Sequence, residues 1–325
     1  MKKYWKIGAA TVLALALAGC GSTEKVSKKE TEKVEQETAS KGAAKDETQT
    51  ISYLDVEYTV PSEVKKIVTA SLEAMEDAAI LGIKPVGALE IAGALPKYLA
   101  TDLEGAELIG DKREPNAEAI LALDPDVIVG TSKWGEDVMT KMNKIETTIP
   151  YSHISTNWKK NLLILGQLSD KEEEAQNIIS DYEAKVADAQ VKTAEQLKDK
   201  TVLIIRVRGG LMNIYPADVY LNPVLYEDLG APIPEIITTA KAQAEITLET
   251  LASVNPDAIF LQFETSENSD APKALEELQA NPIFQSLKAS KEGQVFVNAI
   301  DPLAQGGTAW SKVKFLDAAV KDLLK

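Results

Sequence analysis

The chain contains one cysteine and one histidine among its 325 residues. One cysteine cannot form an intrachain disulfide framework, nor a zinc or iron–sulfur site built from cysteines. One histidine cannot build a metal site that needs several imidazoles. We therefore expect no side chain of this protein to ligate a metal ion directly, and no bound cofactor.

Positive charge is also scarce. The 35 Lys and Arg residues stand against 50 Asp and Glu residues, which leaves a net charge of −15. A surface of this sign repels phosphate backbones, so we expect no nucleic acid partner. With 45% hydrophobic and 26% charged residues, the composition is otherwise that of an ordinary globular protein. The length predicts roughly two domains of about 150 residues each.

Motifs of the common enzyme classes are missing. The chain has no Gly-x-Ser-x-Gly element, no Walker phosphate loop and no Gly-x-Gly-x-x-Gly fingerprint. Arg208-Gly209-Gly210 is too short to count as a phosphate loop, and the sequence next to His153 suggests no catalytic triad. We therefore expect that the protein is not an enzyme. The alternative from another functional class is an enzyme that acts outside the cytoplasm.

The N-terminal residues have the layout of an exported protein. Three lysines precede an apolar run over residues 7–18 that is too short to span a bilayer, as in a secretory signal peptide. The run ends in Leu17-Ala18-Gly19-Cys20, which resembles the lipobox of bacterial lipoproteins. We predict a signal peptide over residues 1–19 and a diacylated Cys20 that anchors the protein to a membrane. A free buried cysteine is the alternative.

The segment that follows the cysteine is polar. Residues 20–50 consist mainly of Lys, Glu, Ser, Thr, Ala and Gln. Such a composition cannot bury enough apolar surface to offset the entropy of ordering. We predict a flexible tether here, with a solvated Glu- and Lys-rich helix as the alternative.

From residue 67 onward, short apolar runs alternate with longer amphipathic stretches, a pattern typical of an α/β protein. Strands are expected at 66–71, 85–89, 126–130, 201–208 and 257–261. One helix is expected at 73–81, and another is expected to end at 227–230. We divide the chain into an N-terminal lobe over 51–159, a connecting helix over 160–198 and a C-terminal lobe over 199–325.

One pattern occurs once in each half. Residues 118–128 and 249–259 both consist of a short helix opening on Glu, an Asp/Asn-Pro-Asp break and a buried strand. The repetition implies two lobes of like topology, although the same spacing fits a common helix-to-strand connection. Between the repeats, residues 160–198 carry apolar residues at helical spacing without a glycine after Gly166, which predicts one long helix.

These features together resemble a known family. The lipobox and tether are followed by two α/β halves, by Lys112-Arg113-Glu114-Pro115-Asn116-Ala117-Glu118 before the first Asp-Pro-Asp, and by Ile246-Thr247-Leu248-Glu249 before the second break. In this order they resemble the iron-siderophore substrate-binding lipoproteins of bacterial ABC importers, from about Val60 to the C-terminus.

The resemblance implies a fold, a function and a location. The fold would be α/β, with two Rossmann-like lobes joined by a long α-helix and a ligand cleft between the lobes that closes little. The protein would be a monomer that captures a ferric siderophore and delivers it to an ABC permease. It would be lipid-anchored on the outer face of the cytoplasmic membrane, most like Gram-positive members.

All three arginines lie outside the acidic helices, at positions 113, 206 and 208. Arg206 and Arg208 stand two apart on a strand, so they share one face, and the strand runs into Gly209-Gly210. Ligands of α/β sheets bind beyond the carboxyl ends of strands, and guanidinium groups offer fork-shaped donors to anionic oxygens. We predict that this pair binds the anionic chelate; the alternative is a pair of surface salt bridges.

The matching strand end of the first half carries Lys133 and Trp134. Lys133 would neutralise charge and Trp134 would pack the chelate's apolar arms, although Trp134 fits equally well as an anchor of its own loop. Arg113 faces either the ligand or a neighbouring acid. The resemblance adds further residues in segments that the family folds around its cleft: Tyr98, Tyr215, Lys241, Gln243, Gln305 and Trp310.

Two repeat-related acids have another implied role. In the family, one acidic residue on each lobe meets arginine pockets of the permease, and the matching positions here are Glu118 and Glu249. The alternative is that each only complements the dipole of its helix, worth about 0.3–1 kcal/mol.

The ligand class stays open at this point. Citrate-type, hydroxamate and catecholate chelates all suit an arginine pair. A haem or a cobalamin receptor of the same fold is the nearest alternative, whereas a zinc or manganese receptor would need more histidines than His153.

Overall fold

The computed structural model describes residues 47–324. The expected signal peptide, Cys20 and nearly all of the expected tether lie outside the described residues. The first element is a hairpin of β1 (Thr48–Tyr53) and β2 (Val56–Pro61), so ordered structure begins inside the segment predicted as tether. Leu54 and Asp55 have φ of 49° and 64°, as a two-residue turn of the type that matches strand twist requires.

The N-terminal lobe is built on a fully parallel sheet in the order β5-β4-β3-β6-β7. Its strands are β3 (Ile67–Thr69), β4 (Gly87–Ala88), β5 (Glu107–Leu108), β6 (Val127–Thr131) and β7 (Thr148–Tyr151). Its helices are α1 (Leu72–Ile80), α2 (Ala117–Leu123) and α3 (Glu136–Asn143). The α1 helix begins where the Ser71 hydroxyl accepts from Ala74 N, and the chain leaves it through Gly82 at φ 64°.

The C-terminal lobe has a mixed sheet in the order β10-β9-β8-β11-β12. Its strands are β8 (Val202–Arg208), β9 (Leu211–Ile214), β10 (Ala244–Ile246), β11 (Ala258–Phe263) and β12 (Val295–Val297). Strands β8, β11 and β12 are parallel, while β9 and β10 each run antiparallel to their neighbour. Gly209 and Gly210, at φ 57° and 77°, form the tight turn between β8 and β9.

The remaining elements after β9 are helices and helical turns. They are the helical turn η2 (Val224–Asp228), α6 (Glu235–Thr239), α7 (Leu248–Val254), the turn η3 (Thr265–Asn268), α8 (Ala274–Ala280), α9 (Pro282–Ser286), α10 (Lys288–Lys291) and α11 (Ala309–Leu323). Two α/β lobes with parallel strands are thus present, and the predicted fold class is confirmed.

The repeated sequence pattern is a repeated structure. Helices α2 and α7 end in left-handed residues, Asp124 at φ 49° and Asn255 at φ 47°. The Asp that follows the proline in each repeat accepts a hydrogen bond from the residue just before a sheet strand. Asp126 accepts from the backbone N–H of Lys66, before β3, and Asp257 accepts from that of Thr201, before β8, both at 2.8 Å. Both lobes are therefore built on one plan.

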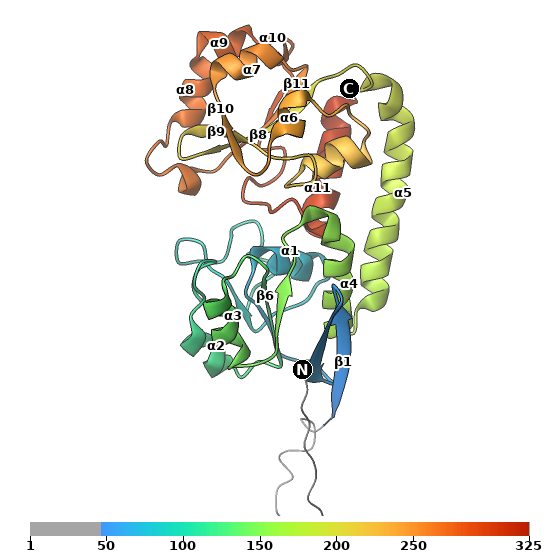
Figure 1. Cartoon of the computed structure of the whole chain (residues 1–325), viewed down its shortest axis with the longest axis vertical. Coiled ribbons are helices and arrows are strands. Elements are labelled where there is room, and N and C mark those ends of the chain that lie inside the picture. Colours follow the sequence, from blue (N-terminus) through green and yellow to red (C-terminus); the bar gives the residue numbers. More distant parts are fainter. Residues whose placement is uncertain (1–46, 325) are drawn as a thin grey trace, which may run out of the picture. The chain divides into compact units, whose positions relative to one another are not determined.

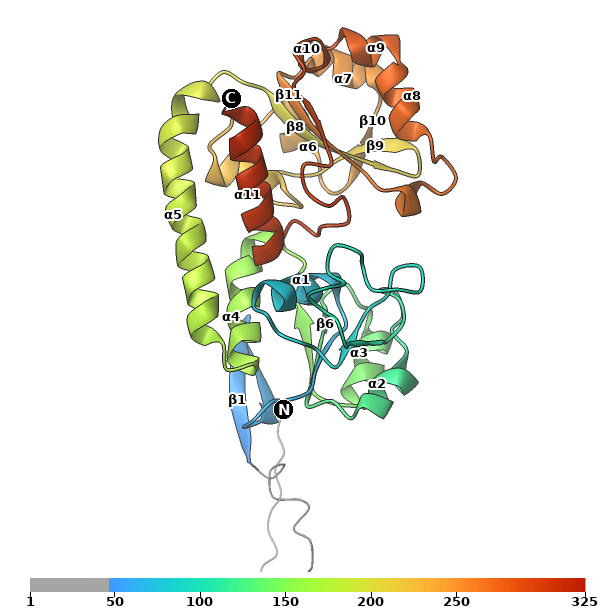
Figure 2. The same cartoon turned by 180° about the vertical axis from the view of Figure 1, so that it is seen from behind.

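The prediction of one continuous connecting helix is wrong, because two helices occupy this part of the chain. Helix α4 (Trp158–Leu168) ends at Ser169, and α5 (Glu172–Gln196) begins two residues after Asp170, which has φ 54°. A Cβ at Gly166 would lie 2.9 Å from Ala175 Cβ, so the two helices pack closely at the corner. Helix α5 then runs alongside both lobes (Figures 1 and 2).

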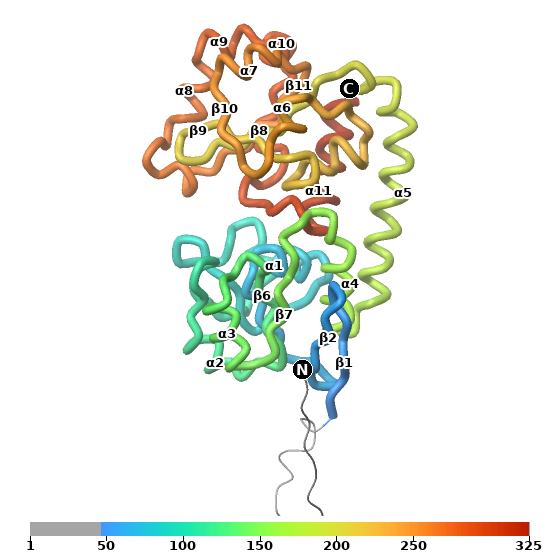
Figure 3. The backbone as a smooth tube through the Cα atoms, in the orientation of Figure 1, coloured from blue at the N-terminus to red at the C-terminus, as the bar shows by residue number. Residues whose placement is uncertain are grey.

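The segment before α11 passes between the lobes, as the tube in Figure 3 shows. A buried acid pair on α1 holds it. The Glu76 carboxylate accepts from Tyr98 Oη (2.6 Å), Gln305 N (2.9 Å) and the hydroxyls of Thr308 and Ser311 (2.5 Å each). Asp77 accepts from Ala309 N (2.8 Å) and Tyr151 Oη (2.9 Å).

We call the contacts of Glu76 and Asp77 with residues 305–311 the lobe junction. Burial raises the pKa of Glu76 to about 7 and that of Asp77 to about 8, although their hydrogen bonds oppose the shift. Because neutral donors satisfy both carboxylates, the junction joins the lobes without using a cation.

Candidate functional site

A cleft of about 1160 Å³ opens where the carboxyl ends of the two sheets face each other. Residues of both lobes line it, which is the position expected for a ligand of α/β sheets. Predicted site residues found in the lining are Arg113, Lys133, Arg206, Arg208, Tyr215, Lys241, Gln243 and Gln305. Eight residues singled out from the sequence thus line one cleft, and five of them are basic; their contact with a ligand stays a prediction.

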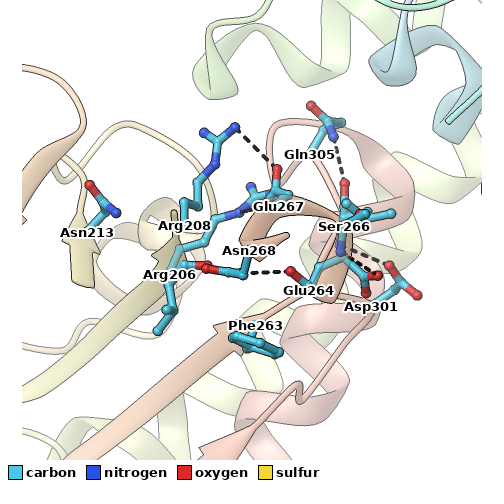
Figure 4. Close-up of polar contacts among 12 residues, drawn as sticks. Arg206, Arg208, Asn213, Phe263, Glu264, Ser266, Glu267, Asn268, Asp301 and Gln305 are labelled. Carbon is cyan, nitrogen blue, oxygen red and sulfur yellow. Dashed lines mark hydrogen bonds and ion pairs between the residues drawn. The ribbon is translucent and has the colours of Figure 1, made fainter. Parts of the chain in front are cut away.

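Arg206 and Arg208 come from β8 and point to one acid, Glu267 of η3 (Figure 4). Arg206 Nε and Nη2 each lie 2.9 Å from Glu267 Oε2, and Arg208 Nη2 lies 3.2 Å from Oε1. The side chains of Arg206 and Glu267 are 9% and 12% exposed. These ion pairs correspond to the alternative of salt bridges, but their residues line the cleft, and the Arg208 side chain remains 36% exposed.

A second set of contacts fixes the arginine directions. Arg208 Nη1 donates to Gln243 Oε1 at 2.9 Å, an oxygen that also accepts from Tyr215 Oη at 3.0 Å. The Arg206 guanidinium lies 5.1 Å from the centre of the Tyr220 ring. Burial opposes the charge of Arg206, but Tyr220 and Glu267 outweigh it and raise the guanidinium pKa. Partners within the protein thus hold both arginine side chains in position.

The first-lobe wall is looser. Lys133 Nζ lies 2.7 Å from Glu73 Oε1, with the lysine 53% exposed and the acid 7% exposed. Lys112 also lines the cleft. Desolvation lowers the pKa of Lys112, and Arg208, Arg206 and Lys133 lower it further while Glu267 opposes them. Lys112 therefore belongs to the same cluster of cations.

Sequence reasoning singled out neither Lys112 nor Glu267. The only signal for Lys112 was its place beside Arg113 in a basic doublet. Glu267 is separated from Arg206 by 61 positions, and its role follows from strand order. Because β11 pairs with β8, the segment after β11 returns to the end of the arginine strand.

Trp134 lies in a smaller cavity of about 400 Å³ that shares Lys133 and Gln305 with the cleft. Its indole covers Gly130, where a Cβ would lie 2.1 Å from the ring. In the described part of the chain, the Trp134 Nε1 is buried without a hydrogen-bond partner. The contact with Gly130 favours the loop anchor that the sequence left open as an alternative, and packing of Trp134 on a ligand stays a prediction.

Two predicted cleft residues are placed elsewhere. The tilted rings of Tyr98 and Trp310 pack with their centres 5.1 Å apart, and the Tyr98 hydroxyl donates to Glu76. Neither lines the cleft described above. Tyr98 instead donates to the junction acid Glu76, and Trp310 belongs to the 305–311 segment of the junction, so the geometry gives no support for their predicted contact with the ligand.

Glu118 and Glu249 both lie in the first turn of their helices, α2 and α7, and both are exposed. A hydrogen bond from the backbone N–H of its own residue, followed by one from the Thr247 hydroxyl, lowers the pKa of Glu249. Leu121, one turn after Glu118, is 61% exposed. These acids therefore present charge on the outside of each lobe, away from the cleft.

His153 lines the cleft and has a partner that the sequence did not indicate. Its Nδ1 lies 2.8 Å from the Ser132 Oγ, and the His153 backbone N–H also donates to that oxygen. The contact joins two loops of the first lobe. Among residues 47–324, no group of three or more His, Cys, Asp or Glu side chains is arranged to hold a metal ion, and no helix is long and apolar enough to cross a bilayer.

Comparisons with known proteins agree with this geometry. Residues 67–299 match the family model for periplasmic binding proteins. The chain is 46% identical over 314 residues to the iron-uptake system-binding protein of Bacillus subtilis, covering 96% of each chain, and 28% identical to its probable siderophore-binding lipoprotein YfiY, covering 90% of each. The crystal structure of the triscatecholate siderophore binding protein FeuA from Bacillus subtilis complexed with ferri-bacillibactin superposes with a TM-score of 0.80 at 48% identity, covering 85% of this chain and 98% of that one.

Proposed function

The chain belongs to the periplasmic binding protein family, and from this premise we propose that it captures a ferric siderophore and passes it to the permease of an ABC importer. Family and relatives are substrate-binding proteins, so it is not an enzyme. The observation that carries the proposal is the concentration of Lys112, Lys133, Arg206 and Arg208 in the cleft of a chain with net charge −15. Such a cleft attracts an anion that the rest of the surface repels.

The cleft favours a catecholate chelate over a hydroxamate. A ferric tris-catecholate carries three negative charges, because three dianions surround one Fe³⁺, whereas a ferric tris-hydroxamate is neutral. Guanidinium and ammonium donors form their strongest hydrogen bonds with charged oxygens. The relative whose crystal structure contains ferri-bacillibactin is described as a triscatecholate binder, which supports the same class.

The described contacts suggest a role for each wall. Arg206 and Arg208 would bind chelate oxygens directly, because both line the cleft and their contacts with Glu267 and Gln243 hold them in position. Lys112 and Lys133 would neutralise the remaining charge. Exposed Arg113 and Lys241 lie at the rim and would act mainly on the rate of capture, as exposed charges do.

We propose the lipid anchor and the membrane location of the protein from its sequence. Cleavage after residue 19 and diacylation of Cys20 would hold the protein on the outer face of the cytoplasmic membrane, as a monomer on a tether that ends at β1. The lipobox-like Leu17-Ala18-Gly19-Cys20 and the lipoprotein relative YfiY support this. A Cys20→Ala variant should be released from the membrane fraction; unchanged membrane association would contradict the anchor.

Permease docking would use Glu118 and Glu249. Helices α2 and α7 lie on the sides of their lobes away from α5 (Figures 1 and 2), and each presents an exposed carboxylate there. The double variant Glu118→Gln, Glu249→Gln should keep its affinity for the chelate in solution and lose iron uptake in cells. The matched control is Glu172→Gln, Glu173→Gln in the first turn of α5. Equal uptake by both double variants would leave only the helix-dipole role.

The ligand class is tested by fluorescence titration of the purified protein. The probes are a ferric tris-catecholate, a ferric tris-hydroxamate, haem and cobalamin. We expect saturable quenching by the tris-catecholate and much weaker quenching by the neutral hydroxamate. Tighter binding of haem or cobalamin would move the protein to another receptor class of the same fold.

A further inference from the structure

The cations of the cleft stand beside almost as many carboxylates. Among the residues that the structure describes, six cationic side chains and five carboxylates line it. Two of the carboxylates neutralise the cations themselves: Glu73 pairs with Lys133, and Glu267 pairs with both arginines. Each wall of the cleft thus carries its own counter-anion.

Glu267 cannot easily leave this position. Its backbone carbonyl accepts from Gly209 N at 3.0 Å. The next residue, Asn268, accepts from Gly210 N at 3.0 Å and donates to the Val207 carbonyl at 3.0 Å. These bonds tie the segment of Glu267 to the β8–β9 turn that carries the arginines. A bound chelate would therefore have the Glu267 carboxylate as a permanent neighbour.

The two functions of such a carboxylate oppose each other. Its hydrogen bonds hold the two guanidinium groups side by side, which favours every anionic ligand equally. Its charge repels the ligand, and this repulsion grows with each negative charge that the ligand carries. Positioning and repulsion can therefore be separated by comparing ligands of different charge.

We propose that Glu267 is a resident counter-anion that sets how strongly the affinity of the cleft depends on the charge of the chelate. It positions Arg206 and Arg208, and it keeps highly charged chelates from being held too tightly to be released. This inference rests on the proposed function, since it concerns the same cleft and an anionic iron chelate.

The test uses two ferric complexes with the same donor chemistry and different charge. A tris-catecholate carries three negative charges and a bis-catecholate carries one. Wild type, Glu267→Gln, Glu267→Asp and Glu264→Gln are titrated with both, and dissociation of each is timed by stopped flow. Glu264 is the matched control, because it belongs to the same segment but is not among the residues lining the cleft.

For Glu267→Gln we expect the tris-catecholate to gain about tenfold in affinity relative to wild type and the bis-catecholate about twofold, with slower release of the former. If the substitution also disturbs the arginine positions, the affinities for both complexes fall by the same factor. The ratio of the tris-catecholate affinity to the bis-catecholate affinity therefore still rises roughly fivefold. Glu267→Asp, which keeps the charge, and Glu264→Gln should retain the wild-type ratio.

An unchanged ratio in Glu267→Gln would overturn the inference, whether both affinities fell together or neither moved. A ratio that rose equally in Glu264→Gln would overturn it as well, because the effect would then belong to net charge. Failure of the wild type to bind either complex would instead contradict the proposed function.

Discussion

The lobe junction and the cleft both contain buried or half-buried acids, but they hold them in different ways. At the junction, Glu76 and Asp77 accept hydrogen bonds from hydroxyl and backbone N–H donors. In the cleft, Glu73 and Glu267 pair with cations. The first arrangement is complete without a ligand. The second holds charges that a ligand can use, so we infer that stability depends mainly on the junction and affinity on the cleft.

The largest effect is expected at the junction. Glu76→Ala leaves the Tyr98, Thr308 and Ser311 hydroxyls and the Gln305 N–H without their acceptor. An unsatisfied buried polar group costs about 1–3 kcal/mol, so the free energy of unfolding should fall by about 3 kcal/mol or more. Denaturant unfolding measures this loss. Affinity for the chelate, measured far below the denaturant concentration at which the variant unfolds, should change little. A large loss of affinity would contradict the inference that the junction determines stability and the cleft determines affinity.

A smaller effect is expected at the looser wall of the cleft. Lys133→Ala removes a half-exposed cation, and exposed charge pairs contribute about 0–1 kcal/mol. Affinity for a ferric tris-catecholate should fall by roughly two- to fivefold, with less loss at high salt. Titration at two salt concentrations checks this. A loss as large as that of an arginine variant would show that the two walls contribute equally.

The pH dependence of stability provides a further prediction from the lobe junction. The folded-state pKa values of Glu76 and Asp77, about 7 and about 8, lie above their values in the unfolded chain. The folded state therefore binds more protons, and stability rises as pH falls from 8 towards 5. Desolvation lowers the pKa of His153, which gives a weaker trend of opposite sign below pH 7. Thermal unfolding should occur at higher temperature at pH 6 than at pH 8.

A double variant of the junction provides the control for this pH effect. Glu76→Gln, Asp77→Asn removes both titrating groups, so the difference between pH 6 and pH 8 should nearly vanish. A wild-type unfolding temperature that fell with the pH would contradict the raised pKa values of Glu76 and Asp77.

The sequence predicted what depends on neighbouring residues. Apolar runs predicted the strands, the repeated Glu-x₆-Pro-Asp pattern predicted two lobes of one plan, and the spacing of Arg206 and Arg208 predicted a shared face. All three are local: they follow from backbone periodicity and from side chains a few positions apart.

What the sequence could not predict depends on strand order and on distant packing. Glu267 reaches the arginines because β11 lies next to β8, and Tyr98 meets Trp310 because α11 returns to the first lobe. The break between α4 and α5 was missed because Asp170 adopts φ 54° without a glycine or proline to mark it. In each case a tertiary contact decided the outcome.

The most direct test of the central claim is the affinity of the double variant Arg206→Gln, Arg208→Gln for a ferric tris-catecholate, measured by fluorescence titration beside its thermal unfolding. Charge-assisted hydrogen bonds contribute about 1.5–3 kcal/mol each, so a loss of roughly 100-fold or more is expected, with the fold retained. A folded double variant that binds the chelate as tightly as wild type would contradict the account of this cleft.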